Sequence, residues 1–153
     1  MRRAVVLCSL VAIATAACAS GGEKKMSAGS GDVVADRQRL MKLNGGSWRD
    51  AQDKLKAGNI EAMAVNAETI AINAQHIPML FPKGSLTDKS KAKADIWEKW
   101  SEFESASKNL EAKAAEVRDA ARAKDQAKVE ALMKDFGRQA CGTCHTPFRQ
   151  PQN

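Results

Sequence analysis

The sequence predicts an all-α protein, an antiparallel up-down-up-down four-helix bundle, and three observations support this fold class. Apolar residues recur at alternating intervals of three and four along four segments, which is the period of packed helices. Short stretches rich in Gly, Pro or charged residues separate these segments. No stretch shows the period-two alternation of a β-strand. Because two of the three connections are short, neighbouring helices should run antiparallel and cross at roughly 20°.

The first helix is expected from about Asp32 to Ala57, and its apolar seam contains polar residues. The residues spaced by seven along this seam are Val34, Met41, Trp48 and Leu55. Arg37 and Asn44 fall between them on the same side, where a plain core would have apolar side chains.

The second and third helices have more regular seams. Asn59 is a suitable N-cap for the second helix, and Pro78 and Pro82 should close it. The seam of this helix consists of Ile60, Met63, Ala67, Ile70, Ala74 and Ile77. The third helix is expected within residues 90–123, and its seam consists of Ile96, Trp100, Phe103, Ser107, Leu110, Ala114, Val117 and Ala121.

The fourth helix should begin near Asp125 and run directly into a cysteine motif at residues 141–145. Its apolar residues are Val129, Leu132, Met133, Phe136 and Ala140. In an up-down-up-down bundle, the start of the first helix and the finish of the fourth lie at the same end. The side chains expected to gather around the cysteines at this end are Arg37, Gln38, Met41, His76, Met79, Phe81, Trp97 and Trp100.

Residues 1–17 have the pattern of a secretory signal peptide. Arg2 and Arg3 precede a short apolar run that ends in small residues. The run is too short for a membrane-spanning helix, which needs roughly 20 apolar residues. Residues 18–31 are expected to form a flexible linker, and residues 32–153 a single bundle domain. We therefore expect an exported protein that functions in the periplasm.

The start of the mature chain depends on Cys18. Thr15-Ala16-Ala17-Cys18 resembles the lipobox of bacterial lipoproteins, in which the cysteine is lipidated, although Thr15 replaces the usual Leu or Val. The alternative is ordinary cleavage near Ala17 or Ala19, which would release a soluble protein. Because the polar linker would suit a tether, we favour membrane anchoring through a lipidated Cys18.

Charge and cysteine content exclude some classes of function. Loss of Arg2 and Arg3 lowers the formal net charge from +6 to +4, and only 5% of residues are aromatic, so no nucleic acid partner is expected. Cys8 would leave with the signal peptide. Cys141 and Cys144 are then the only thiols of the domain, too few for a disulfide framework.

Residues 141–145 read Cys-Gly-Thr-Cys-His, which is the attachment pattern of c-type haem. Two thiols three residues apart lie on neighbouring faces of one helical turn, where both can add to the vinyl groups of one porphyrin. Cys141 and His145 are four residues apart and share a face, which places the imidazole over the iron. The sequence thus predicts one covalent haem c held by Cys141 and Cys144, with His145 as an iron ligand.

Two other uses of this motif agree less well with the sequence. A thioredoxin-type redox pair needs a strand-turn-helix context, which no segment provides. A zinc site needs four ligands, and His76 is the only further candidate outside the motif.

The second axial ligand would distinguish an electron carrier from a gas-binding protein. Met41 should lie at about the height of His145 in the bundle, so its thioether could reach the iron across the porphyrin. It could equally pack on the ring, as methionine on an apolar seam commonly does. Spacing alone leaves both alternatives open, and Met79 and His76 are rival ligands at the same end of the bundle.

The order and spacing of several short pieces resemble the class II c-type cytochromes, the cytochrome c′ family. These pieces are Arg37-Gln38 with Met41, Leu80-Phe81-Pro82 before Gly84-Ser85, Asp95-Ile96-Trp97, and residues 141–145 followed by Phe148-Arg149. The resemblance covers essentially everything after Gly31. It implies that Arg37 and Gln38 contact the haem propionates and that Arg149 lies near the proximal histidine.

Residues 38–45 look like the low-spin members of that family, whose methionine ligand matches Met41. The resemblance therefore implies iron ligated by His145 and Met41, in a periplasmic electron-transfer cytochrome that is not an enzyme. The alternative is a high-spin protein that binds nitric oxide or carbon monoxide at an open distal site. A peroxidase is disfavoured because no distal His–Arg pair is evident. The expected partners are redox proteins, and the family implies a monomer or a homodimer.

Overall fold

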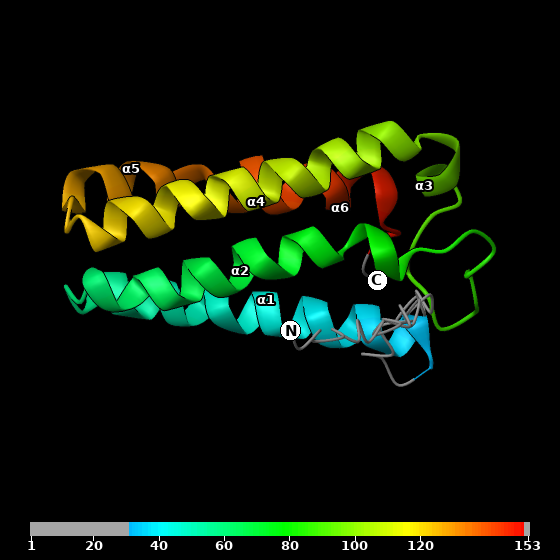
Figure 1. Cartoon of the computed structure of the whole chain (residues 1–153), viewed down its shortest axis with the longest axis horizontal. Helices are drawn as coiled ribbons and strands as arrows, with labels where there is room; N and C mark the ends of the chain where they lie inside the picture. Colours follow the sequence, from blue (N-terminus) through cyan, green and yellow to red (C-terminus); the bar gives the residue numbers. More distant parts are fainter. Residues whose placement is uncertain (1–30, 152–153) are drawn as a thin grey trace, which may run out of the picture.

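The computed structural model describes residues 31–151 and confirms the all-α bundle (Figure 1). The main helices are α1 (Val33–Lys56), α2 (Ala64–His76), α4 (Trp100–Arg122), α5 (Gln126–Phe136) and α6 (Gly142–Phe148). The shorter segments are η1 (Glu61–Met63), η2 (Pro78–Leu80), α3 (Asp95–Glu98) and η3 (Gly137–Cys141). Between residues 31 and 151, the only β-type pairing is one isolated bridge, between Ala92 and Arg149.

The predicted signal peptide at residues 1–17, Cys18 and nearly all of the predicted linker lie outside the described residues. In the part that the structure describes, no helix combines the length and the apolar character needed to cross a membrane.

Side-chain caps fix the first residues of α1 and α5. Asp32 Oδ1 accepts hydrogen bonds from the backbone N–H groups of Val34 and Ala35, at 2.9 and 3.1 Å. Asp125 caps α5 in the same way, by accepting from the N–H of Lys128 at 3.1 Å. These bonds satisfy amide groups that have no partner inside the helix. The predicted starts of the first and fourth helices are therefore confirmed.

The structure corrects three details of the predicted helices. The prediction that Asn59 caps the second helix is wrong. The chain enters α2 through the 3₁₀ turn η1, and neither η1 nor α2 has a side-chain cap. The segment expected to form the third helix is divided at Lys99, which has φ −116° and ψ 44°. The fourth helix does not run directly into the cysteines, because the π-helical turn η3 separates α5 from α6.

The seams predicted for the second and third helices form the core. Every seam residue of the second helix is buried, and so is every seam residue of the third except the half-buried Trp100. α2 and α4 make the most extensive contact of any helix pair, and their buried faces consist largely of alanine. Ser107 Oγ of α4 donates to the carbonyl oxygen of Ala74 of α2 at 2.6 Å, which shows how closely the two backbones approach.

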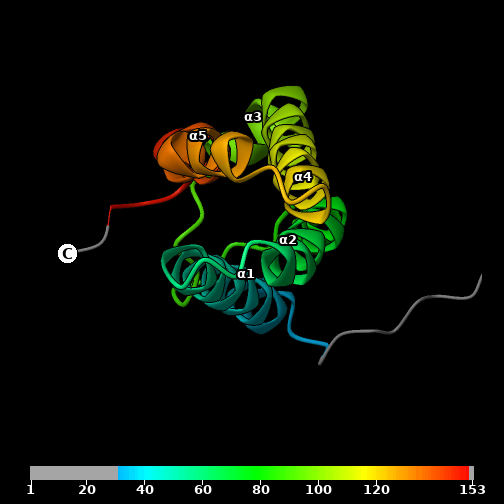
Figure 2. The ribbon, with the colours of Figure 1, turned by 90° about the vertical axis from the view of Figure 1, so that its left-hand side faces the viewer.

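The topology brings four helix ends together, as predicted. The start of α1, the end of α2, the short α3 and the end of α6 all lie at one end of the bundle (Figure 1). Viewed along the bundle, α1 is next to α2, α2 is next to α4, and α4 is next to α5 (Figure 2).

Backbone hydrogen bonds join the C-terminus to the loop before α3. The N–H of Lys93 donates to the carbonyl oxygen of Phe148 at 2.9 Å, and the N–H of Gln150 donates to that of Lys91 at 2.8 Å. The bridge between Ala92 and Arg149 lies between these two bonds. The loop at residues 81–94 is therefore fixed to the chain that follows the cysteine motif.

Replacement of Ala114 by leucine tests the close packing of α2 on α4. Ala114 is 0% exposed, so added methyl groups would force the two helices apart. We expect Ala114→Leu to lower the free energy of unfolding by roughly 1–3 kcal/mol, measured by urea denaturation of the haem-loaded protein. Ala112→Leu is the matched control, since Ala112 lies on the exposed face of the same helix. Equal stabilities of the two variants would contradict this packing.

Candidate functional site

A cavity of about 700 Å³ lies at the end of the bundle where the four helix ends meet. Its wall on α1 consists of Val34, Arg37, Gln38, Met41, Lys42, Asn44, Gly45, Trp48 and Arg49. The wall on the C-terminal side consists of Ala140, Cys141, Cys144, His145, Phe148 and Arg149. It is completed by apolar side chains such as Ile70 of α2, Ile96 of α3 and Phe103 of α4, and by residues between α2 and α3 that include Phe81 and Lys91. Figure 2 shows α1 facing the C-terminal helices, which supply the other wall.

The motif at residues 141–145 contributes both thiols and an imidazole to one wall of this cavity. Cys141 and Cys144 are free thiols and half-buried, and His145 is exposed along the cavity wall. Phe148, one turn beyond, is 4% exposed and packs edge-on against Phe103 with ring centroids 5.4 Å apart. This contact fixes α6 to the core and turns the motif residues toward the cavity.

Desolvation by the surrounding cavity wall shifts the pKa of each reactive group of the motif toward its neutral form, even though the His145 side chain is accessible from the cavity. It raises the pKa of the Cys141 thiol, and burial together with the charge of Cys141 raises the pKa of Cys144 to about 11. Burial, and then the positive charge of Arg149, lowers the pKa of His145. At pH 7 the thiols are therefore protonated, which disfavours thiolate redox chemistry, and the imidazole is in the form that ligates metals.

Arg37 and Gln38 join α1 to the loop at residues 81–94. The guanidinium of Arg37 donates from Nε to the carbonyl oxygen of Leu80 at 2.5 Å, and from its two terminal nitrogens to the carbonyl and hydroxyl oxygens of Ser85. It also lies over the ring of Phe81, 4.1 Å from the centroid. Burial lowers the pKa of Arg37, partly offset by the charge of Asp32.

Gln38 makes the other side-chain contact to this loop. Its Nε2 donates to the carbonyl oxygen of Lys89 at 3.2 Å. Because Arg37 and Gln38 both line the cavity, the residues expected to contact haem propionates also fix part of its rim.

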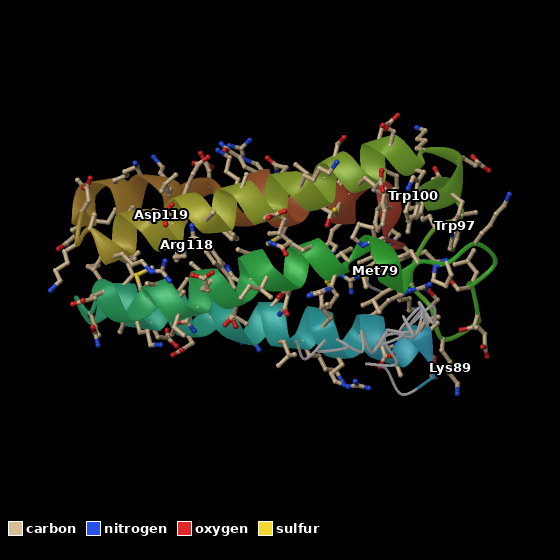
Figure 3. All side chains as sticks on the ribbon, in the orientation of Figure 1. Met79, Lys89, Trp97, Trp100, Arg118 and Asp119 are labelled. Atoms are coloured by element: carbon tan, nitrogen blue, oxygen red, sulfur yellow. The ribbon has the colours of Figure 1, made fainter. Side chains whose placement is uncertain are left out.

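Met41 lines the α1 wall and is half-buried. The rival ligands His76 and Met79 do not line the cavity, and Met79 is 62% exposed. The expectation that Trp97 and Trp100 gather around the cysteines is also wrong, since neither lines the cavity. Figure 3 shows both tryptophans at the same end of the bundle. Trp97 instead donates its indole N–H to the carbonyl oxygen of Phe81 at 2.9 Å.

Two residues of the predicted α1 seam lie in the cavity wall although the sequence did not indicate them as site residues. Trp48 stacks on Phe136 with ring centroids 4.5 Å apart and closes the inner end of the cavity. Asn44 accepts a hydrogen bond from Asn73 Nδ2 at 2.8 Å. Its own Nδ2 is buried and, among residues 31–151, has no partner. The polar character of Asn44 on an apolar seam was the signal available from the sequence.

The residues around the cavity fit a covalently bound haem. Two thiols and a neutral imidazole stand on one wall, a thioether stands on the other, and most of the lining is apolar. The basic side chains of Arg37, Lys91 and Arg149 at the cavity could neutralise two carboxylates. Between residues 31 and 151, no three His, Cys, Asp or Glu side chains are grouped to hold a metal ion.

Comparisons with known proteins agree with this fit. A family model described as Cytochrome C' matches residues 32–149. The chain is 38% identical over 120 residues to cytochrome c-556 of Agrobacterium tumefaciens, an alignment that covers 76% of this chain and 95% of the relative.

Solved structures of cytochrome c′ have the same fold. Cytochrome c' from Rubrivivax gelatinosus matches with a TM-score of 0.68 at 20% identity, covering 78% of this chain and 96% of that one. A nitric oxide complex of a variant of cytochrome c prime from Alcaligenes xylosoxidans matches with a TM-score of 0.70 at 21% identity. This match covers 80% of the present chain and 96% of the solved one. The family model spans most of the chain, and the motif and cavity fit the cofactor. The chain therefore belongs to the cytochrome c′ family and carries one covalent haem c.

Proposed function

We propose that this chain is a haem protein that binds a small neutral ligand, nitric oxide or carbon monoxide, on the distal face of its haem. The observation that carries the proposal is the state of Met41, which lines the α1 wall but is only half-buried. Its side chain packs against the core only in part, and an unbranched thioether can change rotamer to leave room for a diatomic ligand. Haem c supplies an iron whose distal pocket decides between ligand binding and electron transfer.

The residues proposed to hold the haem are Cys141, Cys144 and His145. Each thiol would add across one vinyl group, with its sulfur on one carbon and its hydrogen atom on the other, so that no oxidant would be needed. The lowered pKa of His145 keeps its imidazole neutral and free to ligate iron. Arg37 and Gln38 are proposed propionate contacts, because both line the cavity and both carry several N–H donors.

The apolar part of the cavity lining favours a neutral ligand. Val34, Ile77 and Phe81 line the cavity with apolar atoms. Transfer of an anion into such surroundings costs far more than transfer of a neutral diatomic molecule. A solved nitric oxide complex of the same fold supports this choice of ligand class.

Electron transfer with fixed His145 and Met41 ligands is the second candidate function. It is supported by the place of Met41 on the wall that faces the motif, and by the absence of His76 and Met79 from the described lining. A thioether ligand would favour ferrous iron and raise the reduction potential relative to two imidazoles. The comparisons support ligand binding more directly, because they include a nitric oxide complex of this fold.

Carbon monoxide titration of the reduced protein distinguishes the two functions. We expect the visible spectrum of the wild type to be high-spin and to change readily on addition of carbon monoxide. Met41→Ala should increase the affinity for carbon monoxide by roughly tenfold. The ligand would no longer have to displace the Met41 side chain, and a cost of about 1.4 kcal/mol for that displacement corresponds to this factor. The measurement is the change in absorbance against ligand concentration.

Met79→Ala is the control for this titration, because Met79 is exposed and outside the cavity lining. It should leave the affinity unchanged. Sharp low-spin bands in the wild type, a weak far-red band of the ferric form and no response to carbon monoxide would reject ligand binding. They would favour electron transfer if Met41→Ala then became high-spin.

Intact-mass measurement tests the attachment residues. In a host that matures c-type cytochromes, the wild-type chain should gain the mass of one haem that survives denaturation. Replacement of both Cys141 and Cys144 by alanine should abolish this gain, because no thiol then remains in the domain to form a thioether. A wild-type chain of unmodified mass would show that the proposed attachment does not occur.

The proposed location is the periplasm, with Cys18 as a membrane tether. The support is the signal-like pattern of residues 1–17. We expect the mature wild type to begin at a lipidated Cys18 and to fractionate with membranes, and Cys18→Ala to lose this fractionation. A mature chain that begins at another residue and carries no lipid mass would show ordinary cleavage instead.

A further inference from the structure

The π-helical turn η3 changes the direction of the cysteine motif relative to α5. In an uninterrupted α-helix each residue turns the chain by about 100°, so Phe136 and Phe148 would point about 120° apart. Both are nevertheless in the core, at 3% and 4% exposure. The turn closes through the N–H of Gly142, which donates to the carbonyl oxygen of Gly137. This wider turn accommodates about one extra residue and brings both phenylalanines into the core.

The same change of register determines which way the cysteine motif faces. If η3 were α-helical, α6 would be rotated by about 100° relative to α5. Cys144 and His145 could then not face the cavity while Val129 and Phe136 of α5 remained buried. A π-helical turn is rarely favoured by itself, so its presence at this place requires other contacts.

Two side chains supply those contacts at the carbonyl groups of η3. Asn109 Nδ2, on α4, donates to the carbonyl oxygen of Gln139 at 2.6 Å. The Thr143 hydroxyl donates to the carbonyl oxygen of Ala140 at 2.7 Å, and it lies 3.4 Å from Asn109 Nδ2. Asparagine in the middle of a helix is intrinsically unfavourable, so a specific contact is the physical reason for its place in α4.

We propose that Asn109 and Thr143 clamp η3 and thereby orient Cys141, Cys144 and His145 toward the haem. They are positioning residues, since they act through the backbone of the turn. Thr143 lies inside the motif, whereas Asn109 lies on another helix and links the packing of α4 to the geometry of the proximal side. The inference rests on the proposed attachment residues and is independent of which ligand occupies the distal face.

The test compares donor-free variants of the clamp with variants that keep a donor. Asn109→Leu and Thr143→Val preserve approximate shape and remove the hydrogen bonds, whereas Asn109→Gln and Thr143→Ser retain a donor. Gln75→Leu is the matched control, because it removes a 2.8 Å side-chain hydrogen bond from α2 to Glu111 of α4 and leaves η3 untouched.

Three measurements are made on the haem-loaded proteins. Amide hydrogen exchange at Gly142 reports the hydrogen bond that closes the π-helical turn. The iron–imidazole vibration, measured by resonance Raman spectroscopy of the reduced protein, reports the orientation of His145. Alkylation of free thiols in the denatured protein, read as added mass, gives the proportion of chains in which only one thiol is attached.

We expect Asn109→Leu and Thr143→Val to speed exchange at Gly142 roughly fivefold, which is the effect of losing one ordinary hydrogen bond. They should also shift the iron–imidazole vibration and raise the proportion of singly attached haem. Thr143→Ser, Asn109→Gln and Gln75→Leu should match the wild type in all three measurements.

Two results would overturn the clamp. One is unchanged exchange and vibration in both donor-free variants, and the other is an equal effect of Gln75→Leu, which would indicate general destabilisation. If the wild type carries no haem on Cys141 and Cys144, the attachment proposal fails instead, and exchange at Gly142 still decides whether the clamp exists.

Discussion

The close packing of α2 on α4 is the contact on which the rest of the bundle depends. Alanines on both helices let the backbones approach until the Ser107 hydroxyl reaches the carbonyl oxygen of Ala74. At the far end, Arg118 and Arg122 of α4 pair with Glu68 of α2. Side chains on the other side of the bundle are larger, as the stacked Trp48 and Phe136 show. α1 and the C-terminal helices therefore stand apart at the end where the cavity lies.

The sequence predicted helix positions well because helix burial follows a local period. The ends of α1, the seams of α2 and α4 and the cap at Asp125 all follow from residues a few positions apart. The π-helical turn could not be predicted in this way. It depends on Asn109 and Gln139, which are thirty residues apart and meet only after the helices pack.

Within the site, the sequence predicted the position of each residue along the bundle axis better than the direction in which its side chain points from its helix. The motif and Met41 were placed at one end and do line one cavity. Met79 and Trp97 are at that end too but do not line the cavity, and neither does His76, which lies off the apolar seam of the second helix. Whether the thioether of Met41 ligates iron depends on its side-chain torsions, on which periodicity carries no information.

Hydrogen bonds on two sides hold the loop at residues 81–94 at the rim of the cavity. On one side, side-chain donors of Arg37 and Gln38 hold the loop to α1. On the other, backbone hydrogen bonds hold it to the end of the described chain, from Lys93 to Phe148 and from Gln150 to Lys91. The two sides differ in their tolerance of substitution. The side chains of Lys93 and Gln150, whose contribution to the rim is made by backbone groups, can therefore vary in charge and size without loss of these hydrogen bonds.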